Sequence, residues 1–177
     1  MTLAGSSGLA AREAPASASQ DSLHFLSLQE LASQLQSRAL SPVDVTQYML
    51  DRIAKIDGHL KSYATLTPEQ ALADAYTAER DIRAGKYRGP LHGVPIGIKD
   101  LCDTKGVRTM GGTAVRKDFV PSFDATVVSK LRDAGAVVLG KLNLSEGAAA
   151  GYNPALDVPL NPGTRIGGPA CRPVVRA

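Results

Sequence analysis

GVPIGIKD, residues 93–100, is the segment that decides the fold, because it is an apolar run that ends in Lys99 and Asp100. Small and β-branched residues of this kind are typical of a buried strand, and α/β sheets place their sites at the carboxyl ends of such strands. We therefore expect Lys99 to lie, largely buried, at the end of its strand. A buried lysine can lose its proton near neutral pH and act as a base. The alternative is a solvent-exposed Lys99 with Asp100 as its surface partner.

The chain after this segment predicts a second strand, parallel to the first. A loop rich in Gly and Thr follows Asp100, and residues 136–140 are again apolar. Between them, Asp124 is expected to cap a helix at 125–134 whose Val127, Val128 and Leu131 face inward. A strand, helix, strand order with so long a crossover makes the two strands parallel and the connection right-handed. The strands should be neighbours or one strand apart, with the helix packed on one face of the sheet.

Three helices and a short strand are predicted before this unit. Ser27 with Glu30 and Ser41 with Pro42 are expected to cap the first two helices, and Thr67-Pro68-Glu69 to open the third. Gly58 and Gly85 are expected to end the second and third helices, and residues 63–66 are the strand candidate. His92 is expected to be a partly exposed loop residue.

Composition describes a globular chain of one domain, with 177 residues, 44% hydrophobic and 21% charged. The net charge of +3 arises in a final segment that has three arginines and no acidic residue, so no nucleic-acid partner is expected. Cys102 and Cys171 form no CxxC pair and the histidines have no ligand spacing, so neither disulfides nor a metal or other cofactor is expected. A cytoplasmic setting is the default expectation, and no apolar run predicts a membrane span.

A set of short motifs in the same region points to a known family. The motifs are Gly93-Val94-Pro95 with Lys99-Asp100, Asp124-Ala125-Thr126-Val127-Val128, Leu131, Ala134-Gly135-Ala136, and Gly140-Lys141-Leu142-Asn143 with Glu146. Together they resemble the N-terminal third of the amidase signature family, over a stretch from about His24 to Gly168. The resemblance implies an α/β fold, the incomplete N-terminal part of an α/β/α sandwich in which helices flank a mixed sheet.

The resemblance also implies a chemistry, the hydrolysis of a small-molecule amide by a Ser–cis-Ser–Lys triad. Lys99 falls on the family's catalytic lysine, which takes a proton from a serine in a cis peptide, and that serine activates the nucleophilic serine. A lysine is a weak base at its unperturbed pKa of about 10.4, so the fold must bury it to make it neutral. A backbone oxyanion hole beside the nucleophile completes the family's site.

The sequence departs from the family's pattern after Gly168. In the family, the loop Arg-x-Pro-Gly-Gly-Ser-Ser-Gly-Gly-Ser supplies the first triad serine, with the nucleophile further downstream. Here residues 161–168 begin this loop and residues 169–177 replace the rest, and no serine occurs after Ser145. Because residues 169–177 show no periodicity, we expect a shifted reading frame near Gly167 or Gly168.

Three hypotheses are open at this point. The chain is an N-terminal amidase fragment, inactive alone, that keeps only Lys99 of the triad. Alternatively, it is a non-catalytic subunit or interaction module whose apolar open edge binds a complementary chain or another copy. In the third, Ser145 or Cys171 supplies a new nucleophile for Lys99, although neither has an oxyanion site in view. The expected organisation is the same in all three: a flexible Ala/Ser-rich leader at 1–22, a partial amidase domain at 23–168, and an atypical tail at 169–177.

Overall fold

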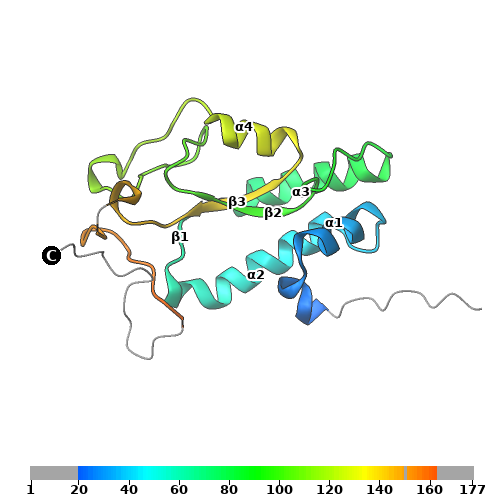
Figure 1. Ribbon diagram of the computed structural model, residues 1–177, viewed down its shortest axis with the longest axis horizontal. Coiled ribbons are helices and arrows are strands. Elements are labelled where there is room, and N and C mark those ends of the chain that lie inside the picture. Colours follow the sequence, from blue (N-terminus) through cyan, green and yellow to red (C-terminus); the bar gives the residue numbers. More distant parts are fainter. Residues whose placement is uncertain (1–19, 150, 163–177) are drawn as a thin grey trace, which may run out of the picture.

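The computed structural model describes residues 20–149 and 151–162, which form a three-stranded sheet with helices on both faces (Figure 1). The helices are α1 (Leu28–Gln36), α2 (Pro42–Leu60), α3 (Pro68–Arg83) and α4 (Thr126–Asp133), and the strands are β1 (Tyr63–Leu66), β2 (Pro95–Lys99) and β3 (Val137–Leu142). Short 3-10 helices lie at Gln20–Phe25, Ala114–Arg116 and Glu146–Ala148. Nearly all of the predicted leader and the whole of the predicted tail lie outside the described residues.

The sheet is mixed, with the strand order β1-β3-β2. β2 pairs with β3 in parallel, and β1 pairs with β3 in antiparallel. The parallel pair and the crossover through α4 confirm the prediction that the two apolar segments are neighbouring strands. The strand predicted at residues 63–66 is also confirmed.

The helices cover the two faces of the sheet in separate layers. Val137 and Leu139 of β3 share a core cluster with Ala75 of α3, whereas Val138 shares one with Val128 of α4. Successive residues of a strand point to opposite faces, so this division places α2 and α3 on one face and α4 on the other. Figure 1 shows the same arrangement, with α4 above the sheet and α2 below it. The α/β class with flanking helices is therefore confirmed.

A β-bulge in β3 changes the face on which its last residues lie. Ile96 and Ile98 are two residues apart and share one face of β2, yet their partners in β3, Val138 and Lys141, are three residues apart. One extra residue in β3 therefore shifts the alternation of its side chains. As a result, Lys141 lies on the same face as Val138, the face that α4 covers.

Gly140 is the residue that allows β1 to approach β3 closely at this bulge. Its φ is 154°, and a Cβ at this position would collide with the carbonyl oxygen of Thr65 in β1. Only glycine combines such a backbone conformation with the absence of a side chain. The bulge and the contact with β1 thus depend on the same residue.

Most helix starts agree with the prediction, and one helix end does not. Ser27 forms a complete capping box, and the Ser41 hydroxyl accepts hydrogen bonds from two backbone N–H groups of the first turn of α2. The predicted end at Gly58 is wrong, because α2 continues to Leu60 and ends at Lys61, which has a left-handed φ of 55°. An internal glycine costs a helix only about 1 kcal/mol, which tertiary packing offsets.

The prediction for the start and apolar face of α4 is wrong in two details. Asp124 does not cap the helix: Ala125 is the N-cap residue and makes no side-chain hydrogen bond to it. The Asp124 carboxylate instead accepts hydrogen bonds from the Lys105 backbone N–H and the Arg132 guanidinium. Val127, predicted to face inward, is 50% exposed, while Val128 is buried.

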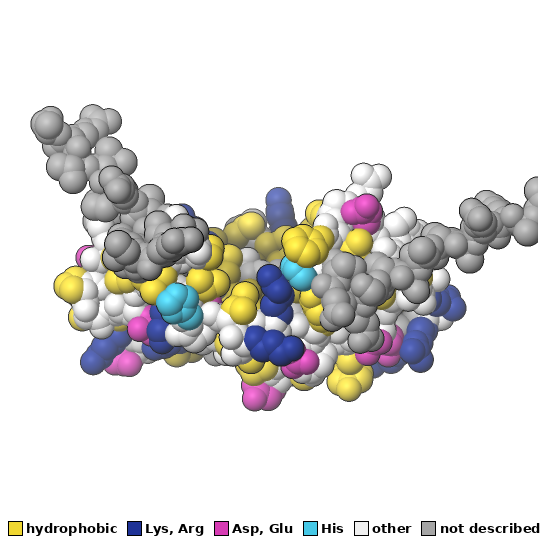
Figure 2. All heavy atoms as spheres, turned by 90° about the horizontal axis from the view of Figure 1, so that it is seen from below, with side chains coloured by type: hydrophobic (Ala, Val, Ile, Leu, Met, Phe, Trp, Pro, Cys, Tyr) yellow, Lys and Arg dark blue, Asp and Glu magenta, His cyan; other side chains and the backbone are white. Residues whose placement is uncertain are grey.

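The surface carries apolar side chains in several places. Figure 2 shows the underside of the view in Figure 1, where hydrophobic side chains lie in separate groups with Lys and Arg side chains between them. In the described residues the most exposed large apolar side chains are Val115 at 93% and Phe25 at 80%. None of the described helices combines the length and the apolar character that crossing a membrane requires.

Candidate active site

Lys99 lies at the carboxyl end of β2, as predicted, but its side chain is exposed. The expectation of a largely buried Lys99 is therefore wrong for the described part of the chain. Ile98 points toward α4 and is 5% exposed, so alternation turns Lys99 to the opposite face, where its side chain is exposed at the end of the strand. Among residues 20–149 and 151–162, the Lys99 side chain has no hydrogen-bond or ion-pair partner.

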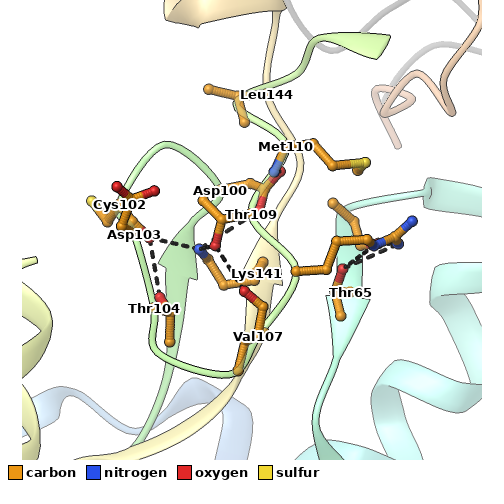
Figure 3. A network of polar contacts seen from close by, with 12 residues as sticks. Thr65, Asp100, Cys102, Asp103, Thr104, Val107, Thr109, Met110, Lys141 and Leu144 are labelled. Carbon is orange, nitrogen blue, oxygen red and sulfur yellow. Dashed lines mark hydrogen bonds and ion pairs between the residues drawn. The ribbon is translucent and has the colours of Figure 1, made fainter. Parts of the chain in front are cut away.

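Asp100 is the partner of Lys141 and not of Lys99. The Lys141 Nζ atom lies 3.6 Å from Asp100 Oδ1, and both side chains are 0% exposed. Figure 3 shows the two groups pointing toward each other beneath the loop that follows β2. The interpretation of Asp100 as a surface partner of Lys99 is therefore wrong, and the buried lysine of this sheet is Lys141.

The Lys141 ammonium is saturated by acceptors from the loop. It donates to the Cys102 carbonyl oxygen at 2.6 Å and to Thr109 Oγ1 at 2.8 Å, in addition to its ion pair with Asp100 (Figure 3). An ammonium has three N–H donors, and here each has an acceptor or an anion within reach. Lys141 is thus built as a structural cation, with no lone pair available to accept a proton.

Burial acts on the pKa of both members of this pair. It raises the pKa of the Asp100 carboxyl, against the opposing effects of the Met110 N–H and the Lys141 charge. It lowers the pKa of the Lys141 ammonium, and the Asp100 charge opposes this shift. The Asp100 charge is the largest effect that stabilises the Lys141 ammonium, whereas the Met110 N–H and the Lys141 charge together stabilise the Asp100 carboxylate. Removing either side chain leaves an uncompensated charge in the interior.

The backbone on both sides of Lys99 is held by hydrogen bonds. The Lys99 carbonyl accepts from the Cys102 N–H at 3.0 Å, and the Asp100 carbonyl accepts from the Gly111 N–H at 3.0 Å. The Asp100 N–H donates to the Leu142 carbonyl at 2.9 Å, which extends the ladder between β2 and β3. The loop after β2 therefore folds back over the carboxyl end of its own strand.

A second loop closes on the first at this edge of the sheet. Gly112 has a φ of 71°, and a Cβ there would lie 2.8 Å from the carbonyl oxygens of Leu144 and Ser145. The Gly147 N–H donates to the Gly111 carbonyl at 2.9 Å. The loops that follow β2 and β3 thus pack backbone to backbone beside the strand end that carries Lys99.

The other predicted nucleophiles do not join Lys99 in the described structure. Ser145 lies in the loop after β3 and is partly buried, with no hydrogen bond to Lys99 in the described part of the chain. Cys171 lies outside the described residues. Sequence reasoning missed the roles of Asp100 and Lys141, although a lysine one residue before the end of an otherwise apolar strand was an available signal of a buried ion pair.

His92 is buried, so the prediction of a partly exposed loop histidine is wrong. Its side chain is 1% exposed, and its Nδ1 accepts a hydrogen bond from the Arg88 backbone N–H at 3.1 Å. The ring packs against Gly135, where any Cβ would collide with it. This packing partner comes from the far end of α4, which local sequence cannot indicate.

A cleft of about 760 Å³ lies away from Lys99. It is lined by the exposed side of α3, residues 105–107 and Ala136, which precedes β3. Because β2 and β3 are parallel, Ala136 and Lys99 lie at opposite ends of the strand pair. Arg132 in the cleft wall is already paired with Asp124 at 2.8 Å. The candidate site is therefore defined by Lys99 and its loops, and not by this cleft.

The fold agrees with one family of hydrolases. The family model described as Amidase matches residues 44–165, and the chain belongs to this family. It is 50% identical, over 143 residues, to a Mycobacterium tuberculosis (strain ATCC 25618 / H37Rv) protein that carries the name amidase AmiD, covering 81% of this chain and 30% of that protein. It is 42% identical to a glutamyl-tRNA(Gln) amidotransferase subunit from Geobacter sp. (strain M21), covering 82% of this chain and 32% of that protein.

Solved structures show the same relationship. The peptide amidase from Stenotrophomonas maltophilia aligns with a TM-score of 0.67 at 37% identity, covering 72% of this chain and 26% of that one. Fatty acid amide hydrolase aligns with a TM-score of 0.74 at 25% identity, covering 81% of this chain and 26% of that one. The expected amidase-type fold is confirmed. The chain spans less than a third of the length of the curated relatives it matches.

Proposed function

We propose that this chain is the lysine-bearing part of an amidase, a hydrolase of carbon–nitrogen amide bonds, with Lys99 as its general base. The observation that carries the proposal is the free side chain of Lys99 at the carboxyl end of β2, exposed and without a partner in the described residues. Lys141 on the neighbouring strand is instead fully bonded. Of these two lysines, only Lys99 is available to a reacting group.

In the proposed reaction, Lys99 Nζ takes a proton from a relay serine, which takes one from the nucleophilic serine. The nucleophile attacks the amide carbon, and the proton returns to the leaving amine when the carbon–nitrogen bond breaks. A lysine is neutral near pH 7 only when surrounding protein excludes water from it. The Ser–cis-Ser–Lys assignment thus requires further protein over the exposed edge of β2.

On this proposal the chain alone does not hydrolyse amides. A lysine can supply a base but neither a nucleophile nor an oxyanion donor. The sequence has no serine after Ser145, so the two serines must come from elsewhere. The amide substrate is a small molecule, and the peptide amidase relationship makes a peptide amide a reasonable first assay.

The test is a chimera in which residues 23–162 replace the matching part of AmiD. The chimera should hydrolyse the amides that AmiD itself hydrolyses, and Lys99→Ala should lower its kcat by at least about 100-fold. Lys130→Ala, on the exposed side of α4, is the matched control and should retain the activity. An active chimera in which Lys99→Ala has no effect would contradict the role of Lys99.

The second candidate function is that of an interaction module. Its support is the loop between β2 and α4, where Val115 is 93% exposed, Val120 54% and Phe123 57%. Apolar side chains so exposed are typical of surfaces that bind another chain. Light scattering tests self-association: a dimer that Val115→Ser and Phe123→Ser dissociate would favour this function over the first.

A further inference from the structure

The buried ion pair beside Lys99 has no part in the proton transfers proposed above. We propose that Lys141 is a positioning residue for Lys99, whose buried ammonium anchors the loop 100–109 and thereby fixes the backbone that carries the base. This inference rests on the proposed function, because it takes Lys99 as the base. The contacts of Lys141 on which it is argued all lie within the described residues.

The Lys141 ammonium holds the loop at both of its ends. Lys141 contacts Asp100 and Cys102 at the start of the loop and Thr109 near its end (Figure 3). Cys102 links this anchor directly to the base, because its N–H donates to the Lys99 carbonyl at 3.0 Å while its carbonyl accepts from Lys141. One cation thus holds both ends of the loop and is linked through Cys102 to the carbonyl of Lys99.

The bulge in β3 places the side chains of Lys99 and Lys141 on opposite faces of the sheet. Lys99 pairs with Leu142, and Lys141 pairs with Ile98. If the same sequence ran on from Val138 as a regular strand with no bulge, Lys141 would lie opposite Lys99 and point to the same face. The bulge turns Lys141 into the loop, and Leu142 instead of a second lysine lies opposite Lys99. Because the two side chains are on opposite faces, Lys141 can anchor the loop while Lys99 acts as the base.

The buried carboxylate of Asp100 requires a positive charge beside it. Asp100 Oδ1 is buried and has no hydrogen-bond donor in the described residues, so its compensation is the Lys141 charge at 3.6 Å. Asp100 Oδ2 accepts from the Met110 N–H at 2.9 Å. If the ammonium is removed, the carboxylate must take up a proton or turn toward water, and either change moves the residue that follows Lys99.

The experiment compares Lys141→Met with the double variant Asp100→Asn/Lys141→Met in this same chain. Hydrogen exchange reports on the amides of Cys102 and Gly111, and the ¹³Cε resonance of Lys99 in lysine-labelled protein reports on the base. In Lys141→Met we expect the two amides to exchange at least 100-fold faster and the Lys99 resonance to shift. The amide of Val137, bonded to the Val94 carbonyl in the central strand, follows the global stability and should exchange faster only by the factor that urea unfolding of the variant gives.

The double variant separates positioning from stability. Removing both charges should restore the protection of Val137, while the Cys102 amide stays fast and the Lys99 resonance stays shifted, because no ammonium holds the loop. Lys130→Met is the matched control and should change none of these signals. If the folded double variant matches the wild type at Lys99 and Cys102, or if exchange rises uniformly across the sheet in both variants, the proposal is overturned. These readouts need no catalysis, so they can fail independently of the AmiD chimera.

Discussion

Lys99 and Lys141 lie on neighbouring strands and differ in what their replacement should cost. Lys99→Ala removes an exposed side chain without a described partner, so the free energy of unfolding should change by no more than about 0.5 kcal/mol. Lys141→Met leaves the Asp100 carboxylate buried and unpaired, which should cost about 3–5 kcal/mol. Urea unfolding followed by circular dichroism measures both values, and equal losses would refute this assignment of roles.

His92 gives the stability of the protein a pH dependence. Burial, followed by the Arg88 charge, holds the pKa of the His92 imidazole below its usual range, against the opposing charge of Asp81. The folded protein therefore binds this proton less tightly than the unfolded chain does. The contribution to stability is complete above the unfolded pKa of about 6.5 and is lost as the pH falls through the folded pKa.

We therefore expect the unfolding free energy to fall by at most about 1.4 kcal/mol per pH unit in that window on account of His92. The comparison is between urea titrations of the wild type and His92→Gln at several pH values from 7 to 5. His92→Gln should remove this part of the pH dependence. His59→Gln, at an exposed position in α2, should retain it, and a wild-type slope in His92→Gln would contradict the argument.

At the scale of elements, two glycines should respond to alanine in opposite directions. Gly140→Ala forces a Cβ against the Thr65 carbonyl in β1 and should destabilise the protein by roughly 2 kcal/mol or more. Gly58→Ala adds a methyl group in α2 where no atom lies within 4 Å, and it should stabilise by roughly 0.5–1 kcal/mol. Thermal unfolding of the two variants tests the pair, and a stable Gly140→Ala variant would mean that β1 and β3 can separate.

Periodicity and cap residues predict where elements lie, and they predict less well which way side chains point. The strands β2 and β3, the helix α4 and the capping box at Ser27 follow from local patterns of apolar and capping residues. The burial of Lys141 depends on a bulge, and that of His92 depends on Gly135 beyond α4. The contact of His92 with Gly135 leaves no mark in the adjacent sequence, and the lysine within the apolar strand β3 indicates a buried ion pair but not the direction of its side chain. The sequence therefore predicted that Lys99 lies at the end of its strand, but not that its side chain is exposed or that Asp100 pairs with Lys141.

At the scale of the whole molecule, exposed apolar surface should limit the stability of the isolated chain. The sheet has three strands in the described residues, and the loop that carries Val115 and Phe123 is open to solvent. Unpaired sheet edges and exposed apolar side chains promote association. We expect a marginally stable or aggregation-prone protein in differential scanning calorimetry and light scattering. A sharp, reversible transition of a monomer would contradict this expectation.

The bulge in β3 also determines which genetic changes the protein can tolerate. Loss of one residue at the bulge, such as Leu139, would make β3 a regular strand in which Gly140, Lys141 and Leu142 keep their partners in β2, so Lys141 would stay on its face. A residue gained between Gly140 and Lys141 would instead place Lys141 opposite Lys99 and turn its charge to the other face, while Asp100 stayed behind without a counterion. The direction of the Lys141 side chain is therefore more sensitive to a residue gained in β3 than to one lost at the bulge.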